Sequence, residues 1–244
     1  MPNLCAIDFG VSNFAAVVCN DGSSMLYKGG AVLSECQWFH KKRAKAVSII
    51  TKGHEHMHAS SRYLSALSRH HADFIKDQCH KISRSIINYC IEHHASTLVL
   101  GENKRWKQDC DMGSQNNQNF VSMPTGLLKQ MIIYKASDAG IKIIMQEESY
   151  TSQADITAMD YIPVYGIDAE NAVFSGKRIS RSLYRCFNGM IINADCNGAA
   201  NIMRKAITDA WNSITDFSFL ASPEVSGFHE LNPLSISVKG IAAA

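Results

Sequence analysis

Three carboxylates stand where an apolar segment ends or a helix begins. Asp8 follows the apolar residues 4–7, Glu102 follows residues 97–100, and Asp195 lies at the start of the stretch NADCNGAANIMRKA. Taken alone, each acid is typical of a turn or a cap, where carboxylates are common. Three buried carboxylates repel one another, however, so a cluster of them usually holds a cation.

Carboxylate oxygens are hard ligands that suit Mg²⁺ or Mn²⁺. Two such ions about 4 Å apart can activate a water and stabilise the leaving oxygen in phosphodiester hydrolysis. Actin-like ATPases also begin with a strand and Asp-x-Gly, as Asp8 and Gly10 do here. That fold normally needs two such domains, and only one is visible, so Glu102 and the Asp-x-Asn pattern at Asp195 favour a nuclease.

The elements that must position these acids follow from the apolar pattern. Residues 4–9, 14–19 and 25–32 are predicted strands, and Asn20-Asp21-Gly22 is typical of a tight hairpin turn between the last two. A helical excursion follows over residues 35–95, broken near Gly53, with isoleucines at a spacing of four.

The second half of the chain alternates strand and helix. Residues 97–100 predict a strand, Pro124 to Gly140 a helix, and residues 141–145 a parallel strand, which together make a βαβ unit. We expect an irregular, basic insertion over 150–192, then a last helix through about Trp211. If that helix forms, Asp195, Ala199, Ile202 and Ala206 share one face, which must pack on the sheet.

These elements predict an α/β fold, a mixed sheet with helices on both faces. Residues 1–211 would form one domain, and residues 212–244, rich in Ser, Pro and Gly, a loosely held tail. Eight scattered cysteines without a Cys-x-x-Cys pair argue against a disulfide framework and a zinc ribbon. No segment reaches the roughly 18 to 20 apolar residues of a membrane span, and Met-Pro-Asn is unlike a signal peptide, so we expect a cytoplasmic, nucleoid-associated prokaryotic protein.

Positive charge is concentrated before and within the last helix. The net charge is only +2, but residues 171–206 hold six basic residues and one acid. Lys177, Arg178, Arg181 and Arg185 are candidate phosphate contacts, with a solvated loop as the alternative. Residues 40–43, which are also basic, are interpreted as the solvent-exposed face of a helix. His54, His56 and His58 are interpreted as a surface cluster.

Six segments also carry a family resemblance in the family's order. They are AIDFGVSNFAAV, LVLGENKRWKQ, NNQNFVSMP, YKASDAGIKIIMQEESYTSQA, GKRISRSLYR and INADCNGAANIMRK. Over residues 4–206 the chain resembles the RuvC-like, RNase H-like nuclease part of TnpB-type (OrfB) proteins from IS200/IS605 transposons, which are similar to compact Cas12 effectors. The resemblance implies that Asp8, Glu102 and Asp195 form the metal-binding catalytic triad of an RNA-guided DNA endonuclease, with DNA and a guide RNA as partners.

Two departures from that family qualify the expectation. Family members usually carry a guide-gripping portion ahead of the nuclease, whereas Asp8 lies close to Met1 here, so such a portion would have to be supplied separately. Many members also hold a four-cysteine zinc ribbon, but residues 150–195 contain only Cys186, so we expect no zinc. A catalytically idle DNA- or RNA-binding remnant, or one part of a split nuclease, is the alternative.

Overall fold

The three predicted strands at the start of the chain form an antiparallel meander. The computed structural model describes residues 3–53, 59–102, 122–167 and 172–232. The strands are β1 (Asn3–Asp8), β2 (Asn13–Cys19) and β3 (Ser23–Lys28). Gly22, at φ 93°, makes the turn between the last two. The third strand is shorter than predicted, because Val32 packs into the core within the helix α1 (Gly30–Ile50).

The main sheet is mixed, with strand order β5-β4-β1-β2-β3-β9. Strands β4 (Ala95–Glu102) and β5 (Lys142–Glu147) run parallel to β1, and α4 (Thr125–Asp138) connects them. Gly140, at φ 73°, ends the turn after α4. The predicted βαβ unit is therefore confirmed, and it brings the carboxyl ends of three parallel strands to one edge.

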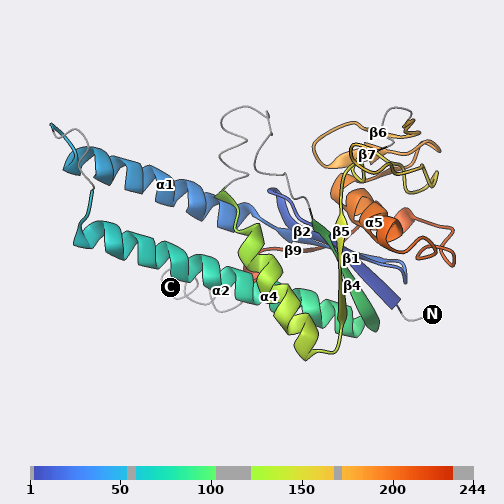
Figure 1. The fold of residues 1–244 in the computed structure, drawn as a ribbon, viewed down its shortest axis with the longest axis horizontal. Helices are drawn as coiled ribbons and strands as arrows, with labels where there is room; N and C mark the ends of the chain where they lie inside the picture. The colour runs from blue at the N-terminus through green and yellow to red at the C-terminus, as the bar shows by residue number, and fades with distance from the viewer. Residues whose placement is uncertain (1–2, 54–58, 103–121, 168–171, 233–244) are drawn as a thin grey trace, which may run out of the picture.

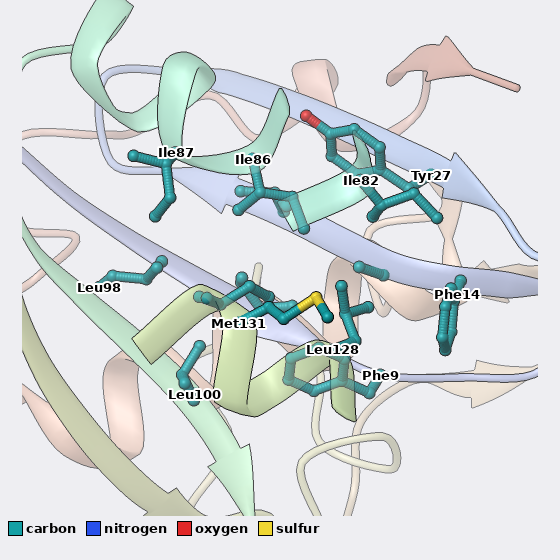
Figure 2. Close-up of a cluster of buried hydrophobic side chains, with 14 of the residues drawn as sticks. Phe9, Phe14, Tyr27, Ile82, Ile86, Ile87, Leu98, Leu100, Leu128 and Met131 are labelled. Atoms are coloured by element: carbon teal, nitrogen blue, oxygen red, sulfur yellow. The ribbon is translucent and has the colours of Figure 1, made fainter. Parts of the chain in front are cut away.

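Helices cover both faces of the sheet, as predicted (Figure 1). Helices α1, α2 (Arg62–Glu92) and α4 lie on one face, and α5 (Ala194–Ala206) lies on the other. Figure 2 shows the hydrophobic core on the α2 and α4 side of the sheet, where Ile82, Ile86 and Leu128 pack against the strands. Truncating a side chain such as Leu128 to alanine would cost about 2–5 kcal/mol of unfolding free energy.

The residues of the predicted helical excursion form two helices, α1 and α2. The break between them includes Gly53, at φ 79°, and Ser61 caps α2 by accepting a hydrogen bond from the Leu64 amide. In Figure 1 the joined ends of the two helices extend well beyond the sheet. The histidine cluster at residues 54–58 lies outside the described residues.

One cross-strand pair departs from the expectation about cysteine. Cys5 and Cys19 lie opposite each other in β1 and β2, with Cα atoms 4.2 Å apart, and are joined as a disulfide. A single bond between neighbouring strands is not a disulfide framework. Among the described residues the other cysteines are free and buried: Cys36, Cys79, Cys90, Cys186 and Cys196.

The insertion is more ordered at its end than predicted. Strands β6 (Lys177–Arg178), β7 (Leu183–Arg185) and β8 (Ile191–Asn193) form a small antiparallel sheet that leads directly into α5. Helix α5 ends at Ala206, short of the predicted end near Trp211. The Trp211 indole instead turns back into the core and donates a hydrogen bond to the Ala200 carbonyl at 3.1 Å.

Residues 212–232 correct the expectation of a loosely held tail. They contain a 3-10 turn (Ser218–Leu220), strand β9 (Glu224–Ser226) and the short helix α6 (Phe228–Leu231). Strand β9 pairs in parallel with β3 at the edge of the main sheet, and Leu220 is fully buried. This part of the tail belongs to the folded unit because it completes both the sheet and a core.

Candidate functional site

Asp8 faces α5, and the pleat of β1 is the reason. Ile7 packs into the core beneath α2 and α4, whereas Ala6 packs beneath α5, so alternation places Asp8 with Ala6. Helix α5 meets the carboxylate with Gly198, where an added Cβ would lie only 2.7 Å from Asp8 Oδ2. The helix can come this close only because residue 198 has no side chain.

Asp195 lies in the first turn of α5, where the structure confirms the predicted helix start. The Asn193 side chain caps the helix and accepts hydrogen bonds at 3.0 Å from the amides of Asp195 and Cys196. The Asp195 carboxylate accepts a 2.7 Å bond from Asn13 Nδ2 and a 3.1 Å bond from Arg178 Nη2. These two donors fix its orientation from β2 and from the small sheet.

Glu148 is a fourth carboxylate of this region, and the sequence analysis missed it. It directly follows β5, and its Oε2 approaches Gly101 so closely that a Cβ there would lie 2.5 Å away. Its charge is the largest one acting on Asp8. An acid at the end of a third parallel strand is the same signal that singled out Asp8 and Glu102, so the pattern could have identified it.

Glu102 is the last residue of β4, as predicted, but it stands differently from Asp8. Strand alternation groups it with Leu98 and Leu100, which pack on the α2 and α4 side. Lys129 of α4 is its electrostatic neighbour, since burial lowers the pKa of that lysine and the charge of Glu102 opposes the decrease. The charges of Asp195 and Glu148 thus act on Asp8, and Lys129 interacts with Glu102, Glu148 and Asp8.

Lys129 of α4 brings a positive charge to the acidic region, by which we mean Asp8, Glu102, Glu148 and Asp195. Its ammonium group donates a hydrogen bond to the Gly101 carbonyl and lies 4.8 Å from the centre of the Phe9 ring. Burial lowers its pKa from the ordinary value, and the charges of Glu148, Glu102 and Asp8 oppose that decrease. One buried lysine against several carboxylates leaves an excess of negative charge.

The electrostatics of Asp8 reflect that excess. Burial raises its pKa well above the ordinary 3.8, and the negative charges of Glu148 and Asp195 raise it further. Arg178 and Lys129 act in the opposite direction without cancelling the effect. Burial also raises the pKa of Glu148. These carboxyls therefore ionise reluctantly in the isolated chain, and an added cation would favour their charged forms.

The loop after β5 is tied to α5, which holds Glu148 in place. Thr151 Oγ1 donates to the Glu148 carbonyl at 2.8 Å, and Asn201 Nδ2 of α5 donates to the Thr151 carbonyl at 3.0 Å. Tyr150 adopts φ 65°, which turns the chain sharply between them. The Tyr-Thr-Ser segment thus supports the acidic region through its backbone and one hydroxyl group.

The predicted phosphate contacts lie on the small sheet and its turn. Lys177 and Arg185 are cross-strand partners, and both are exposed, as is Arg181. Arg178 differs, because its guanidinium bonds to Asp195 and to the Arg181 carbonyl. Three of the four cations are thus presented to solvent, while the fourth is held against an acid.

The carboxylates of this region have the donor atoms that a divalent metal needs. Within the described parts of the chain, no three His, Cys, Asp or Glu side chains are arranged as a ready-made metal site. The chemistry of the donors nevertheless fits Mg²⁺ or Mn²⁺, because they are all carboxylate oxygens. Burial raises the pKa values of two of them, Asp8 and Glu148. Asp8 and Asp195 present carboxylate oxygens of the kind that such an ion binds, and Glu148 adds a further negative charge beside Asp8.

Comparison with known protein families gives two matches in chain order. Residues 3–107 match the family OrfB_IS605, described as a probable transposase, and residues 126–202 match the TNB domain of Cas12f1-like proteins. The predicted acids Asp8 and Glu102 fall in the first match and Asp195 in the second.

The chain is a relative of the TnpB-type and Cas12f proteins. Among curated relatives, this chain is 25% identical over 219 residues to the TnpB-like protein ORF457 of Acidianus two-tailed virus, covering 86% of this chain and 43% of the relative. It is 32% identical over 132 residues to the CRISPR-associated endodeoxyribonuclease Cas12f1 of Sulfoacidibacillus thermotolerans, covering 54% of this chain and 27% of that protein. This chain thus spans less than half the length of these relatives.

Solved structures support the same relationship at the level of fold. This chain superposes on a chain of a Cas12f1–sgRNA–target DNA complex with a TM-score of 0.56 at 16% identity, over 82% of this chain and 49% of that one. A second Cas12f ternary complex gives a TM-score of 0.51, over 82% of this chain and 38% of that one. The predicted RuvC-like architecture is therefore confirmed. None of the helices in the described residues is long and apolar enough to cross a membrane.

Proposed function

We propose that this chain is the nuclease domain of a transposon-associated DNA endonuclease that hydrolyses phosphodiester bonds with Mg²⁺ or Mn²⁺. The observation that carries the proposal is the meeting of Asp8 and Asp195 beside Glu148, at the carboxyl edge of three parallel strands. Carboxylates that crowd at a strand edge without enough cations are typical of metal-dependent phosphoryl chemistry. The relationship to an endodeoxyribonuclease supports the same conclusion.

Each side chain then has a role that follows from its position. Asp8, Glu102 and Asp195 are the proposed metal ligands, and Glu148 adds charge beside Asp8. Asn13 orients Asp195 by donating to one carboxylate oxygen, while its own carbonyl oxygen accepts a 2.9 Å bond from Lys28 Nζ. Bound Mg²⁺ or Mn²⁺ would supply an activated water and stabilisation of the leaving oxygen.

The small sheet would hold the scissile strand. Lys177, Arg181 and Arg185 are exposed on the element that leads straight into Asp195, so a phosphate backbone contacting them would pass the carboxylates. Phosphate contacts of this kind position a strand without reading its sequence. Sequence choice would then come from base pairing with a guide RNA, as in RNA-guided systems.

The direct test is cleavage of end-labelled single-stranded DNA by the purified chain in Mn²⁺ or Mg²⁺. Asp8→Asn preserves the shape of the side chain and should abolish cutting while leaving DNA affinity unchanged. Asp138→Asn, at the exposed end of α4, is the matched control and should cut at the wild-type rate. Equal cutting by Asp8→Asn would overturn the assignment of Asp8.

One observation favours a second function, that of a binding-only remnant. Arg178 already neutralises Asp195, with a 3.1 Å separation between Nη2 and Oδ1. A domain retained only to bind nucleic acid could keep such a pair, because it would have no need to free the acid. Metal-dependent cutting by the wild type would exclude this alternative, and DNA binding without cutting under all metal conditions would support it.

A further inference from the structure

A buried amide joins a surface lysine to one of the proposed metal ligands. Asn13 is the first residue of β2 and is only 4% exposed. Its Nδ2 donates a 2.7 Å hydrogen bond to Asp195 Oδ2, and its Oδ1 accepts a 2.9 Å bond from Lys28 Nζ. Three residues from β3, β2 and α5 thus form one continuous chain of hydrogen bonds.

The local backbone brings Lys28 and Asn13 together. They are cross-strand partners at the end of the β2 and β3 pair away from its turn, and the register shifts directly after Asn13. Such a bulge changes the direction in which a side chain points. The next residue of β3, Gly29, donates to the Ser12 carbonyl at 2.9 Å, and a Cβ there would collide with the Val11 carbonyl oxygen. The close approach of the two segments therefore holds the lysine opposite the amide.

The two charged partners allow only one orientation of the Asn13 amide. An ammonium group has only donors and a carboxylate has only acceptors, whereas an amide has one side of each kind. Turning the amide over would place its NH₂ group against Lys28 and its oxygen against Asp195, and both contacts would be repulsive. Because Asn13 is buried, a lost partner would leave a polar group unpaired. Lys28 thus decides which side of the amide faces Asp195.

The two oxygens of Asp195 have partners of different kinds. Oδ2 accepts from the buried Asn13, whereas Oδ1 lies 3.1 Å from Nη2 of Arg178, whose side chain is 43% exposed. An exposed ion pair contributes little free energy, so the arginine can leave more readily than the amide. The amide therefore fixes the carboxylate, while Oδ1 is the oxygen that can change partners.

We propose that Lys28 is a positioning residue of the carboxylate site and acts on Asp195 only through the amide of Asn13. None of the ion pairs among the described residues involves Lys28, so its effect does not come from direct pairing with a carboxylate there. The inference rests on the proposed function, because Asp195 is a proposed metal ligand. It also predicts a sign. Loss of a positive charge acting through space would tighten cation binding, whereas loss of the amide's orientation weakens it.

The test is calorimetric titration of Mn²⁺ into the full chain without DNA. Lys28→Met keeps a long side chain that cannot donate a hydrogen bond, and it should weaken Mn²⁺ binding about tenfold. Lys28→Arg keeps a donor and should retain nearly the wild-type affinity. Lys142→Met, at the exposed start of β5, removes the same charge and is the matched control. Unchanged or tighter Mn²⁺ binding by Lys28→Met would overturn the proposal.

A double-mutant cycle tests the route through Asn13. Asn13→Leu has nearly the same size and removes both hydrogen bonds, so adding Lys28→Met to it should cause no further loss of Mn²⁺ affinity. Additive losses would contradict the proposal, because they would mean that Lys28 acts by another path. Urea unfolding of each variant checks that the fold persists.

A measurement on the metal-free chain separates this inference from the proposed function. In a nitrogen–proton correlation spectrum recorded in EDTA, the side-chain amide signals of Asn13 are identified by their absence in Asn13→Leu. Lys28→Met should shift these signals and speed their exchange with water, whereas Lys142→Met should not. If the wild type bound no Mn²⁺, the proposed function would fail and these signals alone would decide. Unchanged signals in Lys28→Met would overturn the positioning role.

Discussion

Gly198 lies directly against the carboxylate of Asp8, closer than any residue with a side chain could. A Cβ at this position would sit 2.7 Å from Oδ2, in a helix that otherwise packs on the sheet through alanine and isoleucine. This contact couples the first strand of the chain to its last long helix, at the point where the two acids must cooperate.

Replacing Gly198 with alanine should therefore damage activity more than stability. Helix propensity favours alanine, but overpacking against Asp8 should cost about 1–3 kcal/mol of unfolding free energy. Displacing the carboxylate by about 1 Å should reduce cleavage by about 100-fold. Gly126→Ala, in α4 with open space around it, is the matched control and should stabilise the protein by about 0.5–1 kcal/mol. Wild-type cutting by Gly198→Ala would contradict the close approach.

Glu148 should prove necessary for metal binding although sequence reasoning did not select it. Glu148→Gln removes the largest charge acting on Asp8, so we expect Mn²⁺ affinity and cleavage to fall by about 10–100-fold. Calorimetric titration with Mn²⁺ reports the affinity independently of cutting. Glu147→Gln is the neighbouring control, because Glu147 pairs instead with Lys205 Nζ at 2.6 Å.

Comparison with Glu102→Gln decides which acid completes the set. If Glu102 is a metal ligand, as proposed, its glutamine variant should lose Mn²⁺ binding at least as severely as Glu148→Gln. If only Glu148→Gln loses binding, the third ligand is Glu148, and the role of Glu102 is restricted to its electrostatic contact with Lys129.

Arg178 should affect metal and DNA in opposite directions. Its guanidinium bonds to Asp195, so Arg178→Gln frees that carboxylate and should tighten Mn²⁺ binding severalfold while weakening single-stranded DNA binding. Arg185→Gln, on the neighbouring strand, should weaken DNA binding without changing Mn²⁺ affinity. A loss of both affinities in Arg178→Gln would mean that the arginine orients Asp195 and does not mask it.

The raised pKa of Asp8 predicts a definite pH dependence of stability in EDTA. A carboxyl whose pKa is higher in the folded state binds more protons there, so its contribution to stability is present below the ordinary 3.8 and is lost as pH rises towards the folded value. Asp8→Asn has no such loss. It should therefore be more stable than wild type at neutral pH and nearly equal to it at about pH 3.5, as urea unfolding would measure.

Adding Mn²⁺ provides the complementary check of the same group. Binding to the folded state should stabilise the wild type at neutral pH by mass action and leave Asp8→Asn almost unchanged. Identical pH profiles of wild type and variant in EDTA would contradict a raised pKa at Asp8.

Much of the fold could be predicted because its pattern is local. A short apolar run predicted β1, and apolar residues at a spacing of four predicted α2. The end of α5 was missed, since burial of Trp211 against Ala200 depends on residues that a helical pattern does not distinguish. Strand β9 was missed for a related reason: three residues pairing with β3 from the far end of the sequence leave no local signature.

The residues of the candidate site could also be predicted only in part. Acids at strand and helix ends identified Asp8, Glu102 and Asp195, and the same rule would have identified Glu148. The partners of those acids could not be predicted, because Arg178, Asn13 and Lys129 reach them from separate elements. Which face Glu102 takes depends on strand parity relative to the helices, and this emerges only once the sheet has formed.

Strand β9 also has a protective role in the sheet. Its pairing with residues 25–27 covers backbone groups of β3 that would otherwise form an open edge. Open edges recruit strands from other molecules. A chain shortened to residue 211 would keep every acid named above and yet expose this edge, so it should self-associate, and its poor solubility could be mistaken for a defect of the catalytic centre.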